Sequence, residues 1–211
     1  DTRAYIAMQD GSGATARDLS SWSNNCTFDS AAIQWLPNSK FGAWALNLPN
    51  PPDGGGLACG SNGLTVSAFS AELYVYYQGD GWLMSNLSNY PESERWIWSI
   101  IGGKPALQVY VGGGGSNVTL TSSLTKDRWY HLAVTFDGDR TVRFYQDGAL
   151  KYTGTLNLSG IRTPVVPLYI GAAQAHTRIR GKILFAKVSN GVLTSFPHGS
   201  FVNVTNEPTT A

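Results

Sequence analysis

Pairs of acidic residues that could support hydrolysis are scarce in this chain. Glu92 and Glu94 lie two residues apart, so both would face the same side of an extended segment. Glycoside hydrolysis requires two carboxyl groups that face each other across a cleft, and a solvated turn explains this pair more simply. Glu72 stands alone in a predicted strand, where a hydrogen bond to a tyrosine or an arginine is the simpler role. We therefore expect that the chain is not an enzyme.

Other catalytic motifs are absent from the sequence as well. His131, His176 and His198 are far apart, and no zinc-cluster spacing occurs. There is no Gly-x-Ser-x-Gly elbow to present a nucleophile. The glycine run at 112–115 has neither the lysine nor the helix of a phosphate-binding loop.

Aspartates in predicted loops raise the question of Ca²⁺, which binds several oxygen ligands. These aspartates are Asp10, Asp18, Asp53, Asp80, Asp137 and Asp139. Each of them is also a common turn residue. A Ca²⁺ site that uses Asp18 with backbone carbonyls, or one near Asp80, stays open as an alternative, so the metal content is unknown.

Aromatic residues give a stronger indication of a binding site. Sugar rings stack on aromatic side chains, while sugar hydroxyls bond to acids and amides. The candidate ligand-binding residues are Tyr74, Tyr76, Trp82 and Glu72. The first two and Glu72 share one side of a predicted strand, and Trp82 follows a Gly-Asp-Gly turn. Large aromatics also fill cores, and this alternative applies to Trp96 and Trp98 in particular.

The elements that must position these residues are strands, because apolar residues alternate with polar ones between Gly, Asn and Asp turns. The predicted strands are 69–77, 95–101, 106–111, 129–136, 141–146, 150–156, 168–172 and 182–188. Asp147 and Gly148 have the residue types of a tight hairpin turn. Segments 80–90 and 112–117 are expected to form loops at the rim.

Composition restricts the class of protein further. The chain has 211 residues and a net charge of +1, with 14% charged and 12% aromatic residues. These values argue against disorder and against a nucleic-acid partner. No apolar stretch reaches the ~20 residues of a membrane helix, so direct membrane insertion is not expected. We predict one domain over 1–202 and a linker-like tail over 203–211, within a larger chain.

Cysteines and glycosylation motifs indicate a secreted or cell-surface location. Cys26 and Cys59 are either buried free thiols or one disulfide, which would stabilise the fold by about 3–4 kcal/mol. The disulfide is the favoured interpretation. Asn-X-Ser/Thr motifs, which are N-glycosylation acceptors, begin at Asn25, Asn86, Asn117, Asn157 and Asn203.

Two central segments resemble a known family. Residues 129–138 (WYHLAVTFDG) and 142–148 (VRFYQDG) are similar to the signature of the laminin-G-like, concanavalin A-like lectin/glucanase superfamily. Segments 69–76, 168–171 and 180–183, with the opening Asp-x-Ser turn at 18–20, resemble its other strands and turns. The resemblance implies an all-β fold, an antiparallel two-sheet jelly-roll β-sandwich, in which Tyr74 and Tyr76 would lie on the concave side.

Three functions agree with these observations. The first is an extracellular, non-catalytic, lectin-like module that binds a glycan. The second is a protein-binding adhesion or receptor module on a cell or virus surface. The third is an accessory domain of a larger enzyme. A contiguous exposed apolar patch would favour the protein partner, whereas a polar-lined groove would favour the glycan.

Overall fold

The structure is a computed structural model of the chain, and it describes residues 1–38, 43–49, 55–86, 95–112, 114–159, 166–171 and 178–196. These residues form strands, turns and connecting loops. Since they contain no helix, none of them forms a helical segment of the length and apolarity needed to cross a membrane.

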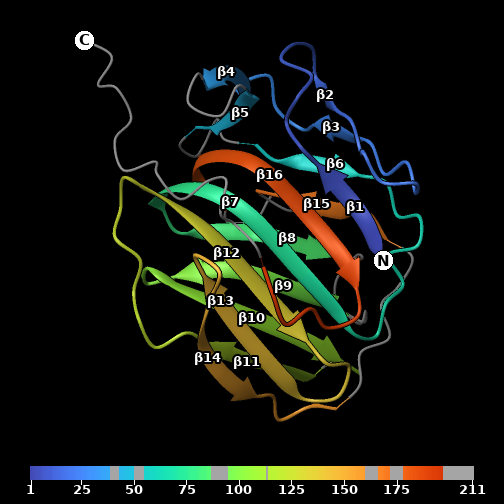
Figure 1. The fold of residues 1–211 in the computed structure, drawn as a ribbon, viewed down its shortest axis with the longest axis vertical. Coiled ribbons are helices and arrows are strands. Elements are labelled where there is room, and N and C mark those ends of the chain that lie inside the picture. The colour runs from blue at the N-terminus through green and yellow to red at the C-terminus, as the bar shows by residue number, and fades with distance from the viewer. Residues whose placement is uncertain are drawn as a thin grey trace.

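The strands form two antiparallel sheets that lie face to face (Figure 1). Sheet A has the order β14 (Ala149–Thr155), β13 (Thr141–Gln146), β12 (Arg128–Phe136), β7 (Phe69–Gly79), β16 (Arg180–Asn190), β5 (Ala43–Leu48) and β4 (Gln34–Asn38), with β1 (Thr2–Ile6) also paired to β16. Sheet B has the order β11 (Gly114–Thr119), β10 (Lys104–Val111), β9 (Arg95–Ile101), β8 (Gly81–Asn86), β15 (Leu168–Ile170), β6 (Leu57–Cys59), β3 (Cys26–Phe28) and β2 (Thr15–Ala16). The predicted two-sheet sandwich is confirmed.

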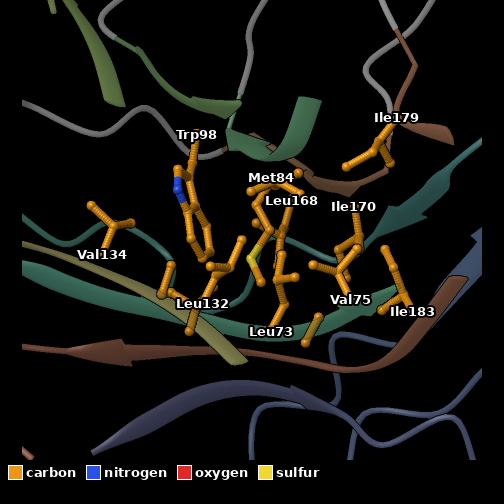
Figure 2. Close-up of a cluster of buried hydrophobic side chains, with 14 of the residues drawn as sticks. Leu73, Val75, Met84, Trp98, Leu132, Val134, Leu168, Ile170, Ile179 and Ile183 are labelled. Atoms are coloured by element: carbon orange, nitrogen blue, oxygen red, sulfur yellow. The ribbon is translucent and has the colours of Figure 1, made fainter. Parts of the chain in front are cut away.

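The core lies between the inner faces of the two sheets (Figure 2). Strand β7 contributes Leu73 and Val75 from sheet A, and strands β8 and β9 contribute Met84 and Trp98 from sheet B. Successive side chains of a strand point to opposite faces, so each strand gives alternate residues to the core. The residues between them lie on the two outer faces of the sandwich.

Tight turns connect the strands as their residue types predict. Asp147 and Gly148 join β13 to β14 with φ angles of 52° and 78°, the left-handed values that a primed hairpin turn requires. Asp80 alone separates β7 from β8, so one residue carries the chain from sheet A to sheet B. There is no room for a side chain at Gly81, because a Cβ atom would lie 2.3 Å from the backbone of Arg178.

Two segments that were expected to be rim loops contain strands in their described parts. Residues Gly81–Asn86 form β8, a central strand of sheet B, and Gly114–Thr119 form β11, its edge strand. The glycines in both segments concealed the alternation, since they bring no side chain to either face. The structure confirms the other strand predictions in position, within a few residues at their ends.

The two cysteines form a disulfide. Cys26 and Cys59 are direct partners across neighbouring strands β3 and β6. The alternative of two free thiols is therefore excluded. The crosslink ties the irregular first part of the chain to sheet B.

Candidate ligand-binding faces

The predicted site residues lie on opposite outer faces of the sandwich. Glu72, Tyr74 and Tyr76 alternate with the core residues of β7, so they lie on the outer face of sheet A. Trp82 is in β8 and pairs with Ser99, which alternates with core residues of β9, so it lies on the outer face of sheet B. The four residues cannot form one site.

On sheet A, Glu72 is paired with two basic side chains, while the buried Oγ1 atom of Thr135 has no hydrogen-bond partner among the described residues. Glu72 Oε1 accepts from Lys187 Nζ at 2.7 Å, and its Oε2 lies 3.2 Å from His131 Nε2. The Glu72 side chain is 11% exposed and that of His131 only 2%. Glu72 thus hydrogen-bonds as a structural acid would, although its partners are a histidine and a lysine instead of a tyrosine or an arginine.

The protonation of Glu72 follows from this pairing. Burial by itself would raise the pKa of the carboxyl group, but the hydrogen bonds from His131 and Lys187 and the positive charge of Lys187 outweigh burial. The pKa of Glu72 is therefore lowered from its ordinary value. A glycosidase acid needs the opposite shift, because it must hold a proton at neutral pH.

The aromatic residues of sheet A form a small hydrophobic cluster of their own. Tyr74 is 5% exposed and stacks on Trp129, with ring centroids 5.4 Å apart. Burial, together with the charge of Asp147, raises the pKa of Tyr74 to about 12. Tyr76 is half-buried, and Lys182 Nζ lies 4.9 Å from the centre of its ring. Most of this aromatic surface is therefore packed within the protein.

The chain also covers part of this face with its own segment 191–196, which we name the strap. After β16, Gly191 and Leu193 are hydrogen-bonded to Ser70, whose hydroxyl donates to Gly191 O and accepts from Leu193 N, both at 2.8 Å. Phe196 is 3% exposed and packs against Tyr145, with ring centroids 4.7 Å apart. Figure 1 shows this segment running back across β7 and β12.

On sheet B, cross-strand partners form two rows across the outer face. One row runs from Asn117 through Gln108 and Ile97 to Ser85 and then to Tyr169. The next row contains Thr119, Ala106, Ser99 and Trp82. Both rows alternate along their strands with core residues, so they face away from sheet A. Polar and aromatic side chains share this face.

Two hydroxyl groups on this face lack partners. Ser85 and Ser99 are fully buried, and the Oγ atom of each has no hydrogen-bond partner in the described part of the chain. A buried hydroxyl that makes no hydrogen bond costs about 1–3 kcal/mol, so such groups usually have a specific reason. In this structure a ligand could bond to these hydroxyl groups only after a side chain that covers them has moved.

Aromatic side chains surround these serines. Trp82 and Tyr169 are half-buried on the two strands next to each other, β8 and β15. Tyr110 is half-buried on β10, and the guanidinium group of Arg95 lies 4.2 Å from the centre of its ring. The sequence pointed to Trp82 but not to Tyr110, Tyr169, Ser85 or Ser99. For the strands that contain these four residues, the sequence analysis did not assign which side faces outward.

Trp96 and Trp98 fill the core, which confirms the alternative to a ligand-binding role. Trp96 and Trp98 are 2% and 0% exposed and belong to the core between the sheets. Trp96 stacks on Phe69 of sheet A, with ring centroids 4.6 Å apart. Neither tryptophan can contact a ligand on an outer face.

Two aspartates considered for Ca²⁺, Asp18 and Asp80, bond to N–H and O–H groups of the fold itself. The Asp18 carboxylate accepts hydrogen bonds from the backbone N–H groups of Tyr5, Ser20 and Asn24 and from the Ser20 hydroxyl. Asp80 accepts from the Tyr77 hydroxyl at 2.6 Å. Within the described ranges, no three His, Cys, Asp or Glu side chains gather where they could hold a metal ion. Asp53 lies outside the described residues.

The glycosylation motifs differ in exposure. Asn25, Asn117 and Asn157 are exposed. Asn86 is 1% exposed, so the folded protein has no room for a glycan there, which corrects the expectation for this residue. Asn203, together with Glu92, Glu94, His176 and His198, lies outside the described residues.

Comparison with known proteins agrees with this architecture. The sequence profile of the concanavalin A-like lectin/glucanases superfamily, of laminin-G type, matches residues 52–195. The fold is a jelly-roll sandwich, the architecture of the lectin/glucanase superfamily. The chain belongs to the concanavalin A-like lectin/glucanases superfamily. A comparison with curated protein sequences finds no match.

Several solved structures are similar in fold at low sequence identity. Domain 4 of AbnA, a GH43 extracellular arabinanase from Geobacillus stearothermophilus, was solved in complex with arabinotriose. It superposes with a TM-score of 0.74 at 15% identity, over 92% of this chain and 94% of that domain. The binding domain of botulinum neurotoxin serotype G gives 0.67 at 16% identity, over 92% of this chain and 48% of its own.

A third similar structure is that of botulinum neurotoxin type C, whose cell entry depends on interaction with two ganglioside molecules. It gives a TM-score of 0.68 at 14% identity, over 91% of this chain and 48% of that chain. This chain therefore spans about half the length of both toxin chains. At these identities the likeness establishes the fold alone.

Proposed function

We propose that this chain is a non-catalytic, extracellular glycan-binding module whose ligand lies on the outer face of sheet B. The observation that carries the proposal is the pair of buried, unpartnered hydroxyl groups of Ser85 and Ser99 beside half-buried Trp82 and Tyr169. An aromatic ring beside hydroxyl groups suits a sugar, which has an apolar face and many hydroxyls. We assign the site to sheet B because its half-buried rings lie on neighbouring strands, whereas on sheet A the acid Glu72 is paired with His131 and Lys187 and the aromatic rings pack on one another.

The similar structures support this class of ligand. One was solved with arabinotriose, and another belongs to a toxin whose cell entry depends on gangliosides. Both ligands contain sugar. The first is also a domain of an extracellular enzyme, which agrees with the alternative of an accessory domain. The disulfide agrees with an oxidising, extracellular compartment.

Two observations favour a glycan over the other classes considered. The large apolar side chains exposed in the described residues, Leu19, Ile101 and Leu150, come from three separate segments, which does not favour a protein-docking patch. The lowered pKa of Glu72 makes this acid unsuited to protonate a leaving group. Binding without catalysis is thus the simplest function.

The test is a glycan-array screen of the purified chain, followed by calorimetric titration of the strongest hit, with arabinotriose as a further probe. Trp82→Ala should weaken binding at least tenfold, which corresponds to about 1.4 kcal/mol. Tyr76→Ala is the matched control on sheet A and should leave affinity within twofold. Melting curves must show that both variants are folded, and a parallel screen with a chelator should give the same hits.

Weaker binding by Tyr76→Ala, together with unchanged binding by Trp82→Ala, would place the ligand on sheet A, where Tyr74, Tyr76 and Glu72 lie. A blank array with a folded chain would count against the glycan and favour a protein partner. Because Trp82 also contacts its own neighbours, Ser99→Ala is a second, smaller test of the same face. This substitution removes a buried hydroxyl group that the fold itself does not bond, so it should not destabilise the protein, and a loss of affinity would show that the ligand reaches this serine when it binds.

A further inference from the structure

Asn117 belongs to an exposed glycosylation motif on the proposed ligand face. It pairs directly with Gln108, and Gln108 pairs with Ile97 of the next strand, which pairs with Ser85. Neighbouring strands are about 4.8 Å apart, so Asn117 lies roughly 14 Å from Ser85 along this row. The motif residue Thr119 stands in the row that leads to Trp82.

The local structure keeps the Asn117 side chain outside the core. Its neighbour Val118 is 6% exposed and packs into the core, so the alternation of β11 turns Asn117 and Thr119 outward. Asn117 Nδ2 donates to Thr119 Oγ1 at 3.3 Å, a short-range contact that needs no other part of the protein. A sugar attached to Nδ2 would therefore displace no core residue.

Strand β11 also gives a reason for a glycan at this place. It is the edge strand of sheet B, and an edge strand presents unpaired backbone groups that can pair with another chain. A bulky, solvated glycan beside the edge would hinder such pairing. The motif at Asn25 reaches the same row from the other side, because Thr27 pairs with Ala58 and Ala58 pairs with Tyr169. The side chain of Asn25 is already used by the fold, since its Oδ1 accepts a hydrogen bond from the backbone N–H of Asp18 at 2.9 Å. Asn157 follows β14, a strand of sheet A.

We propose that Asn117 carries an N-linked glycan that extends over the outer face of sheet B and weakens ligand binding there by steric exclusion. Occupancy of Asn117 is a claim about modification alone. The weakening of binding rests on the proposed function. The two parts are measured separately, so a failure of one is distinguishable from a failure of the other.

The first measurement is occupancy. The chain is produced in a eukaryotic secretory host, and its peptides are mapped by mass spectrometry. We expect a glycan at Asn117, and its loss in both Asn117→Gln and Thr119→Ala, since either change destroys the motif. An unmodified Asn117 would overturn the proposal.

The second measurement is affinity for the oligosaccharide that gives the strongest array signal. Asn117→Gln, and the wild-type chain after enzymatic removal of its N-glycans, should both bind at least threefold more tightly than the glycosylated chain. Asn157→Gln is the matched control and should bind like the wild type. Equal affinity of the glycosylated and deglycosylated chains would refute steric exclusion. If the deglycosylated chain binds no glycan at all, the proposed function fails, and steric exclusion fails with it.

Discussion

Replacement of Glu72 by Gln tests whether the outer face of sheet A is a structural cluster or a ligand site. Glu72 is 8% exposed and bonds to Lys187 and His131. Removing one partner of a fully buried ion pair costs about 3–5 kcal/mol. Water can reach the Lys187 side chain, which is 29% exposed, and Gln keeps one hydrogen-bond acceptor. We therefore expect Glu72→Gln to reduce the free energy of unfolding by about 2 kcal/mol at pH 7.

The effect of this substitution should depend on pH in a defined direction. Because the pKa of Glu72 is lowered in the folded protein, its contribution is complete above the ordinary value of 4.5 and is lost as pH falls through the folded value. The difference between wild type and Glu72→Gln should thus be constant from pH 7 to pH 5 and shrink below about pH 4.5.

Urea unfolding of both proteins at pH 7, 5, 4 and 3 measures this difference. A double-mutant cycle with Lys187→Met isolates the coupling between the two side chains. Glycan affinity should not change in Glu72→Gln as long as the protein is folded. The reasoning would be refuted by a stability difference near zero at pH 7, by one that grows in acid, or by a folded variant that loses the ligand.

Four further variants test the scaffold by calorimetric melting. Replacing both Cys26 and Cys59 by Ala should lower stability by about 4 kcal/mol on a loop-entropy estimate for their sequence separation of 33, and an unchanged melting temperature would contradict this. Gly181→Ala should destabilise the protein by more than 3 kcal/mol or prevent folding, because its Cβ would lie 2.0 Å from a carbonyl oxygen of β7. Gly114→Ala is the control: its Cβ would make only ordinary contacts, so this variant should melt like the wild type. Phe196→Ala should cost about 3 kcal/mol if the strap is part of the fold, whereas a loss below 0.5 kcal/mol would show that it is not.

The sequence predicted the fold well because the signals are local. Alternation over 69–77 and 129–136 defines which residues of β7 and β12 enter the core. The Asp147-Gly148 turn requires left-handed backbone angles that few residues accept, and the structure has them. Strand β8 was missed because Gly81 and Trp82 follow a turn signal that resembles a loop.

The site was predictable only in part, because it depends on which sheet each strand joins. Trp82 and Tyr76 are six residues apart, yet the single residue Asp80 between β7 and β8 sends them to opposite faces. Ser85 and Ser99 carry no sequence signal, since a serine becomes unusual only when it is buried without a partner. The strap that covers part of sheet A is likewise invisible in the alternation of the strands.

The most direct test of the central claim is to map the bound oligosaccharide by NMR chemical-shift perturbation on the isotopically labelled chain. We expect the largest shifts at the backbone amides of Ser85 and Ser99 and at the indole N–H of Trp82, with little change at Tyr74 and Tyr76. Shifts confined to Tyr74 and Tyr76 would contradict the account and place the ligand on the opposite face of the sandwich.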